Sequence, residues 1–266
     1  MPRANIGDAE LYYEEAGSGP PLLLVPGLSG QGLFWAKQAP DFARDFCVIV
    51  HDNRGTGKST WSRIAYSVDQ MAADVLRLMD ALGIASAHLV GHSTGCAIGQ
   101  VIAQDHPERL QSLVLSATWP GPDAYFRRLF QSRREVLVTL GVESYLRASA
   151  LALAPPWWVR DNDALLAEQH RQAATAAPPV EVMASRIDAI VAFDRRARLG
   201  EIRTPTLVIV AQDDMITPRF YSDELASRIQ GAKLVVLEAG GHFVPQIPPE
   251  LYNAPVGSFL RAQLGR

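Results

Sequence analysis

Cysteine is scarce in this sequence of 266 residues, which contains only Cys47 and Cys96. Both lie in apolar surroundings, and neither belongs to a closely spaced set of metal ligands. Of the six histidines only His88 and His92 have the four-residue spacing of metal ligands on one helix face, and they lie in and just after a predicted strand rather than in a helix. We therefore expect two buried free thiols and no metal site.

An excess of basic residues is also absent. The chain has 25 lysines and arginines against 28 aspartates and glutamates, for a formal net charge of -3. Binding of nucleic acid depends on positive charge that displaces counterions from the phosphates. We therefore expect no nucleic-acid partner.

Long hydrophobic runs are missing as well. No stretch approaches the roughly 20 consecutive apolar residues that span a bilayer. The first ten residues lack the basic start and apolar run of a signal peptide. These observations predict a cytoplasmic protein with no membrane partner.

Short apolar runs, by contrast, recur along the chain and alternate with helix-like segments. Continuous apolarity is typical of parallel strands that helices cover on both faces, so the pattern predicts an α/β fold in one domain. Residues 9–16 are predicted to form an antiparallel edge strand. The predicted buried strands are Leu22–Val25, Cys47–Val50, Ala87–Val90, Leu113–Leu115, Leu207–Val210 and Leu234–Leu237.

This rhythm stops between Trp119 and Leu199, where helix-like segments replace the strands. Because the strand pattern resumes at Thr206, the segment is predicted to be a helical cap inserted into one sheet. We assign residues 1–118 and 200–266 to the core and residues 119–199 to the cap. The predicted cap helices are Tyr125–Leu140, Val142–Leu153, Leu165–Ala174 and Val180–Phe193.

The sharpest motif is Gly91-His92-Ser93-Thr94-Gly95, which follows one predicted strand and precedes a predicted helix. At such a turn the serine is raised above the sheet edge, and small residues on either side let the backbone pass. The pattern also arises by chance, but its strand–turn–helix setting favours Ser93 as a nucleophile.

A serine nucleophile needs a base and a carboxylate that orients the base, and in this architecture they follow later strands in the order acid, then histidine. Asp213 and Asp214 follow the strand at 207–210, and His242 follows the strand at 234–237. His242 is therefore the predicted base, and one of the two aspartates is its partner. The other would be a turn or capping residue.

Acyl transfer also requires donors for the oxyanion that develops on the attacked carbonyl. The backbone N–H of Thr94, at the start of the predicted helix, is one candidate. The loop after the first buried strand, Pro26-Gly27-Leu28-Ser29-Gly30, offers the N–H of Leu28 as the second.

With these residues in place, the chain resembles the α/β-hydrolase superfamily over nearly its whole length. It also contains Asp52-Asn53-Arg54-Gly55-Thr56-Gly57-Lys58-Ser59, which is similar to a structural turn of that family. The family places the acid four residues before a proline, here Pro218, and this selects Asp214. In many relatives a histidine stands where this chain has Pro26.

Within the superfamily the sequence looks most like aminoacrylate hydrolases of the Rut pathway and, more distantly, 3-oxoadipate enol-lactonases. The similar stretches are residues 27–30 with Trp35, 52–57, 70–73 and 130–133. The resemblance implies hydrolysis of an amide, enamine or ester-type bond in a small polar metabolite. Some of those aminoacrylate hydrolases lack the elbow serine, whereas this chain has the complete set.

Substrate contacts are harder to predict. Phe34 follows the oxyanion loop and Trp119 stands at the cap entrance, so both are candidates. Arg127 is the candidate chosen from a set of cap arginines that could pair with a substrate carboxylate. Such arginines are more often solvated or paired with neighbouring acids. The remaining members of this set are Arg128, Arg133, Arg134, Arg195 and Arg196.

The sequence as a whole predicts a serine hydrolase that cleaves an amide, enamine or ester-type bond of a small metabolite without a cofactor. It leaves open whether the substrate bears a carboxylate and whether the protein is a homodimer. Two alternatives remain at this point. One is a lactone or carboxylic-ester hydrolase with the same triad, and the other is a ligand receptor that keeps the fold without turnover.

Overall fold

Eight strands form one sheet in the computed structural model, which describes residues 2–265. Their order across the sheet is β1-β2-β4-β3-β5-β6-β7-β8. The pairs β1–β2 and β2–β4 are antiparallel, and all later pairs are parallel. The strands are β1 (Arg3–Asn5), β2 (Glu10–Ala16), β3 (Pro21–Val25), β4 (Cys47–His51), β5 (Ala87–His92), β6 (Leu110–Ser116), β7 (Thr206–Ala211) and β8 (Lys233–Leu237).

Helices cover both faces of this sheet because successive side chains of a buried strand point to opposite sides. In β3, Leu22 and Leu24 pack with α1 (Ala39–Phe42) and α9 (Pro249–Arg261). Leu23 and Val25 pack on the other face. That face is covered by α2 (Val68–Ala81), α3 (Thr94–Asp105) and α8 (Arg219–Arg228). Three short 3-10 helices lie between these elements, η1 (Gly32–Trp35), η2 (Pro107–Arg109) and η3 (Arg196–Glu201).

The predicted α/β architecture is confirmed, since each of the six predicted buried strands overlaps a strand of the sheet. Two details differ. The strand expected at the sheet edge, β2, is covered on its outer side by β1, so β1 is the edge. Cys96 is buried, but Cys47 is only partly buried because it starts β4 near the surface.

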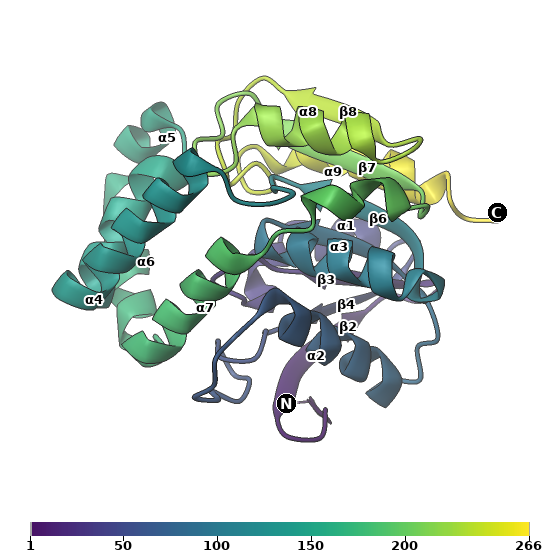
Figure 1. Cartoon of the computed structure of the whole chain (residues 1–266), viewed down its shortest axis with the longest axis horizontal. Coiled ribbons are helices and arrows are strands. Elements are labelled where there is room, and N and C mark those ends of the chain that lie inside the picture. The colour runs from purple at the N-terminus through teal and green to yellow at the C-terminus, as the bar shows by residue number, and fades with distance from the viewer. Residues whose placement is uncertain (1, 266) are drawn as a thin grey trace.

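Four helices between β6 and β7 form the cap: α4 (Ala124–Leu153), α5 (Pro156–Asp161), α6 (Asp163–Thr175) and α7 (Val180–Ala192). Figure 1 shows them gathered at one end of the sheet, on the left of the view. Helix α4 is interrupted at Gly141, whose φ of 80° and ψ of 177° are not helical. This break separates the two helices that were predicted on either side of residue 141.

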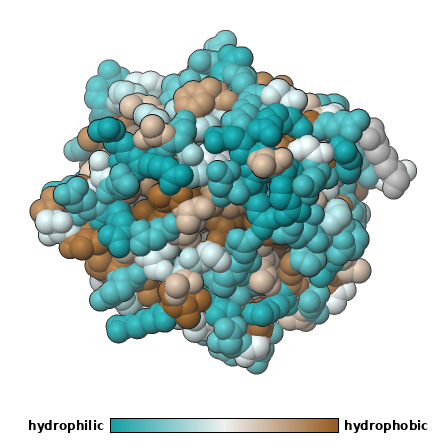
Figure 2. Space-filling model, viewed as in Figure 1, coloured by the Kyte–Doolittle hydropathy of each residue, from teal (hydrophilic) through white to brown (hydrophobic). Residues whose placement is uncertain are grey.

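By length and composition alone, α4 could cross a membrane, the one such helix found in the described part of the chain. The interruption at Gly141 leaves two shorter pieces, and α4 contacts both α6 and α7. In the space-filling view, hydrophilic side chains cover most of the visible face, and apolar ones gather mainly on its cap side (Figure 2).

Candidate active site

Ser93 lies between the end of β5 and the start of α3, in a strained backbone conformation. Its φ is 53°, a value that few residues other than glycine adopt. The N–H of Ser93 donates to the carbonyl of Ser116 at 2.9 Å, and its carbonyl accepts from the hydroxyl of Thr118 at 3.1 Å. A side chain at Gly95 would collide with the carbonyl of Val25 in β3. The elbow is therefore held tightly against the neighbouring strands.

Asp214 and His242 meet at the carboxyl ends of β7 and β8. The Nδ1 of His242 lies 2.9 Å from Oδ2 of Asp214. The carboxylate of Asp214 also accepts from the N–H groups of Ile216, at 2.8 Å, and Thr217, at 2.9 Å. The hydroxyl of Thr217 donates to it at 2.8 Å. Both Asp214 and His242 are buried, so the ring orientation of His242 is defined by a fully hydrogen-bonded carboxylate.

Asp213 has a different hydrogen-bond partner from Asp214. Its Oδ1 accepts from the N–H of Gly241 at 2.8 Å, directly before His242 in the chain. On the other side of the histidine, the N–H of Phe243 donates to the carbonyl of Leu153 at 3.0 Å, at the end of α4. The structure thus places Asp214 against the imidazole and Asp213 against the loop that carries it.

The loop after β3 lies beside the elbow. The N–H of Gly30 donates to the carbonyl of Gly27 at 2.9 Å, which forms a tight turn. In a trans peptide the C=O and N–H point in opposite directions, so the N–H of Leu28 points out of this turn. Thr94 begins α3, and the first N–H groups of a helix have no partner within it. A Cβ at Gly27 would lie 3.3 Å from the Cβ of Ser93, so the peptide that carries the Leu28 N–H is close to Ser93, and Thr94 directly follows Ser93 in the chain.

His92, which precedes the nucleophile, packs against the catalytic candidates. Its ring stacks on Phe34 with the centroids 4.7 Å apart and lies 4.9 Å from the ring of His242. Complete burial, together with the nearby His242, lowers the pKa of His92 well below its usual value. His92 is therefore a neutral packing partner of Phe34 and His242.

A cavity of about 330 Å³ opens between the core and the cap, with Ser93 and His242 in its wall. Most of its lining is apolar. The core contributes Gly27, Leu28 and Phe34, and the cap contributes residues of α4, α6 and α7. The polar side chains that the cap adds are Arg133, Tyr145, Ser149, Gln169, His170 and Arg186.

Of the three predicted substrate contacts, only Phe34 lines this cavity. Trp119 is fully buried and stacks on Phe126, 4.6 Å away, so it fills the junction between cap and core. Arg127 is exposed on the outer side of α4. The expectations for Trp119 and Arg127 are corrected accordingly, because the rotation of α4 turns Arg133 toward the cavity in place of Arg127.

Two residues that line the cavity, Arg133 and Arg186, were not predicted as site residues from the sequence. Arg133 was one of six cap arginines that looked alike. Arg186 is one of three charged residues in α7, beside Glu181 and Asp188, and the sequence alone does not distinguish it from the other two. Among residues 2–265, no group of three or more histidine, cysteine, aspartate or glutamate residues is arranged to hold a metal ion.

Comparison with known proteins identifies the class. A family model described as the alpha/beta hydrolase fold matches residues 20–245. The chain therefore belongs to the α/β-hydrolase family and is a hydrolase.

Two relatives show which members of the α/β-hydrolase family this chain is similar to. The chain is 39% identical over 253 residues, 95% of this chain and 96% of the relative, to a protein of Azorhizobium caulinodans that bears the name carbamate hydrolase RutD. A protein of the same name from Caulobacter vibrioides is 38% identical, with 98% of this chain and 99% of the relative covered. The family resemblance stated from the motifs is confirmed.

Solved structures agree with this assignment. The enol-lactonase from Burkholderia xenovorans LB400 has a TM-score of 0.90 and 27% identity, with 98% of this chain and 100% of that chain covered. A thermophilic esterase from Thermogutta terrifontis has a TM-score of 0.87 and 27% identity, with 99% of each chain covered.

Proposed function

We propose that this chain is a serine hydrolase that cleaves a C–N or C–O acyl bond of a small carboxylate-bearing metabolite. The observation that carries the proposal is the hydrogen-bonded pair of Asp214 and His242 in the wall of the same cavity as the strained Ser93. This arrangement supports a nucleophile, a base and an orienting carboxylate.

In the proposed reaction, the hydroxyl oxygen of Ser93 attacks the substrate carbonyl while His242 takes its proton. The N–H groups of Leu28 and Thr94 donate to the oxyanion of the tetrahedral intermediate. The C–N or C–O bond then breaks, and His242 returns the proton to the leaving group. Water, deprotonated by His242, cleaves the acyl-enzyme and releases the acid and Ser93.

The surroundings of Arg133 support the proposal that the substrate bears a carboxylate. Its Nη2 donates only to neutral oxygens, those of Tyr145 at 3.0 Å and Ser149 at 3.2 Å. Its Nε is buried without a hydrogen-bond partner among the described residues. Other cap-side arginines have acidic partners, as in the pairs Arg134–Asp188 and Arg196–Glu224. A guanidinium in the cavity wall without a carboxylate partner is suited to bind one from the substrate.

The relatives guide the choice of bond. The names carbamate hydrolase, enol-lactonase and esterase all describe cleavage of an acyl group from nitrogen or oxygen. Lactone opening is the second candidate, and the enol-lactonase neighbour, aligned over its whole length, favours it. Both reactions use the same steps at Ser93.

The nucleophile is tested by intact mass measurement after treatment with a fluorophosphonate, for wild type and Ser93→Ala, followed by hydrolysis of p-nitrophenyl acetate. We expect one adduct and loss of activity in the wild type only. Labelling of neither protein, or equal hydrolysis by both, would rule the proposal out.

The carboxylate preference is tested with p-nitrophenyl esters of acetate and hydrogen succinate. Arg133→Gln should raise KM for the anionic succinyl ester by roughly 10- to 100-fold and leave the acetyl ester nearly unchanged, because only the former loses an ion pair. Arg127→Gln, on the outer face of the same helix, is the matched control. Equal effects of Arg133→Gln on both esters would contradict carboxylate binding.

A further inference from the structure

Arg186 is a fully buried cation that extends from the cap helix α7 into the core. It is 1% exposed. Its Nη1 donates to the carbonyl of Arg54 at 2.6 Å, and its Nη2 donates to the carbonyl of Leu28 at 3.1 Å. No acidic side chain forms an ion pair with it among residues 2–265. Burial lowers the pKa of Arg186 to about 10, so it remains charged at neutral pH.

Burial of an arginine side chain is unfavourable in free energy, because hydrogen bonds or an opposite charge must replace its contacts with water. The partners of Arg186 are two backbone carbonyls. One of these belongs to Leu28, whose N–H is the proposed oxyanion donor. The bond to the Leu28 carbonyl restrains the peptide that follows Leu28, and the Gly30–Gly27 bond restrains the peptide that precedes it. Together they define the direction of the Leu28 N–H.

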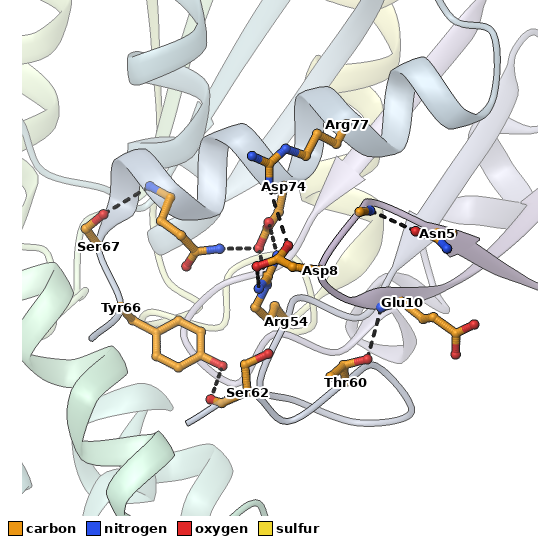
Figure 3. Close-up of polar contacts among 12 residues, drawn as sticks. Asn5, Asp8, Glu10, Arg54, Thr60, Ser62, Tyr66, Ser67, Asp74 and Arg77 are labelled. Atoms are coloured by element: carbon orange, nitrogen blue, oxygen red, sulfur yellow. Dashed lines mark hydrogen bonds and ion pairs between the residues drawn. The ribbon is translucent and has the colours of Figure 1, made fainter. Parts of the chain in front are cut away.

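The other partner, the carbonyl of Arg54, is itself held rigidly. The Arg54 guanidinium pairs with Asp74 of α2 at 2.8 Å and with Asp8, between β1 and β2, at 2.7 Å. Figure 3 shows Arg54 enclosed between these two carboxylates, with Arg77 of α2 directed at Asp8. Arg186 therefore donates to one carbonyl on a rigid scaffold and to one on the loop that serves the reaction.

The same scaffold also holds the loop directly. The N–H of Asn53 donates to the carbonyl of Gly30 at 2.7 Å, and Oδ1 of Asp52 accepts from the N–H of Gly32 at 2.8 Å. These bonds lie within the core. Arg186 is different because it reaches the loop from the cap, across the boundary at which the cavity lies.

We propose that Arg186 is a positioning residue that links the cap to the oxyanion loop and orients the Leu28 N–H toward the developing oxyanion. The inference rests on the proposed function, because it assigns a role within that reaction. It makes the geometry of the oxyanion site depend on the docking of α7. It also differs from a role in substrate binding, which would depend on the charge of the acyl chain.

The test compares wild type with Arg186→Gln and Arg186→Lys, using the acetyl and succinyl p-nitrophenyl esters and a phenylboronic acid that forms a tetrahedral adduct with serine. We expect Arg186→Gln to lower kcat by roughly 10- to 100-fold on both esters, with KM within about threefold. The boronic acid should bind more weakly by a similar factor. Lysine cannot donate to both carbonyls in the same geometry, so Arg186→Lys should retain intermediate values.

The matched control is Arg134→Gln, which removes an ion pair between α4 and α7 without reaching the cavity wall, and should keep kcat within about twofold. An unchanged kcat in folded Arg186→Gln would overturn the inference, as would a loss confined to KM of the succinyl ester. If Arg186→Gln fails to fold, Arg186→Lys decides: unchanged kcat and boronic acid affinity would overturn the inference equally. Equal hydrolysis by wild type and Ser93→Ala would instead refute the proposed function itself.

Discussion

Asp213 and Asp214 stand side by side in the chain, yet their carboxylates have different partners. Asp214 accepts from the imidazole and from three groups of its own turn, whereas Asp213 accepts from the backbone of the histidine loop. Both residues lie just after the end of β7, where each carboxylate meets a different partner. It allows the two residues to be separated by matched substitutions.

Asp214→Asn should lower kcat by roughly 10³- to 10⁴-fold on p-nitrophenyl acetate, because an amide can donate to Nδ1 and so favour the wrong tautomer of His242. Asp213→Asn keeps an oxygen that can accept from Gly241, so its kcat should stay within about fivefold. Steady-state kinetics of both variants test this. Comparable losses in the two would contradict the assigned roles.

His51 provides a second test at the scale of one residue. It is buried in β4, and its Nε2 lies 3.0 Å from Oδ1 of Asn53. Burial lowers the pKa of His51 from 6.5 to about 4. Between pH 6.5 and pH 4, His51 is protonated in the unfolded chain but neutral in the folded chain. The contribution of neutral His51 to the free energy of unfolding is therefore fully present above pH 6.5 and is lost as the pH falls toward 4.

We expect the free energy of unfolding of the wild type to fall by about 2 kcal/mol more between pH 7 and pH 5 than that of His51→Gln. Urea denaturation of both proteins at the two pH values measures the difference. Equal losses would show that His51 takes up its proton in the folded state.

At the scale of elements, the elbow depends on how closely α3 approaches β3. Gly95 lies where a side chain would meet the carbonyl of Val25, and neither backbone segment can retreat without disturbing the sheet. The motif from which Ser93 was predicted therefore describes a packing requirement as much as a catalytic one.

Gly95→Ala should destabilise the protein by about 3 kcal/mol, because the added methyl collides with backbone rather than with a flexible side chain. Gly200→Ala is the control, since a Cβ there meets nothing within 4 Å, and it should change stability by less than about 0.5 kcal/mol. Chemical denaturation compares them. A Gly95→Ala protein as stable as wild type would mean that the elbow can relax.

At the scale of the whole molecule, cap and core share one hydrophobic cluster. Phe126 and Ile187 of the cap belong to the same buried cluster as Leu89 and Val208 of the sheet. Trp119 stands at the junction, which explains why it packs rather than contacts substrate.

We therefore expect cap and core to unfold together, because separating them would expose this shared surface. Calorimetry should give one transition, coincident with the loss of helical signal in circular dichroism. Two resolved transitions, or early loss of helix with the sheet intact, would show that the cap unfolds independently.

The sequence by itself predicted seven of the eight strands, the break at Gly141 and the roles of Ser93 and His242, and the family resemblance selected Asp214 over Asp213. These features depend on local apolarity, on backbone freedom and on the order of residues after strands, which are properties of short segments of the sequence. Only the tertiary structure decided which arginines reach the cavity. The rotation of α4 and α7 against the core turns Arg133 and Arg186 inward and Arg127 outward, and that rotation results from packing between segments far apart in the sequence.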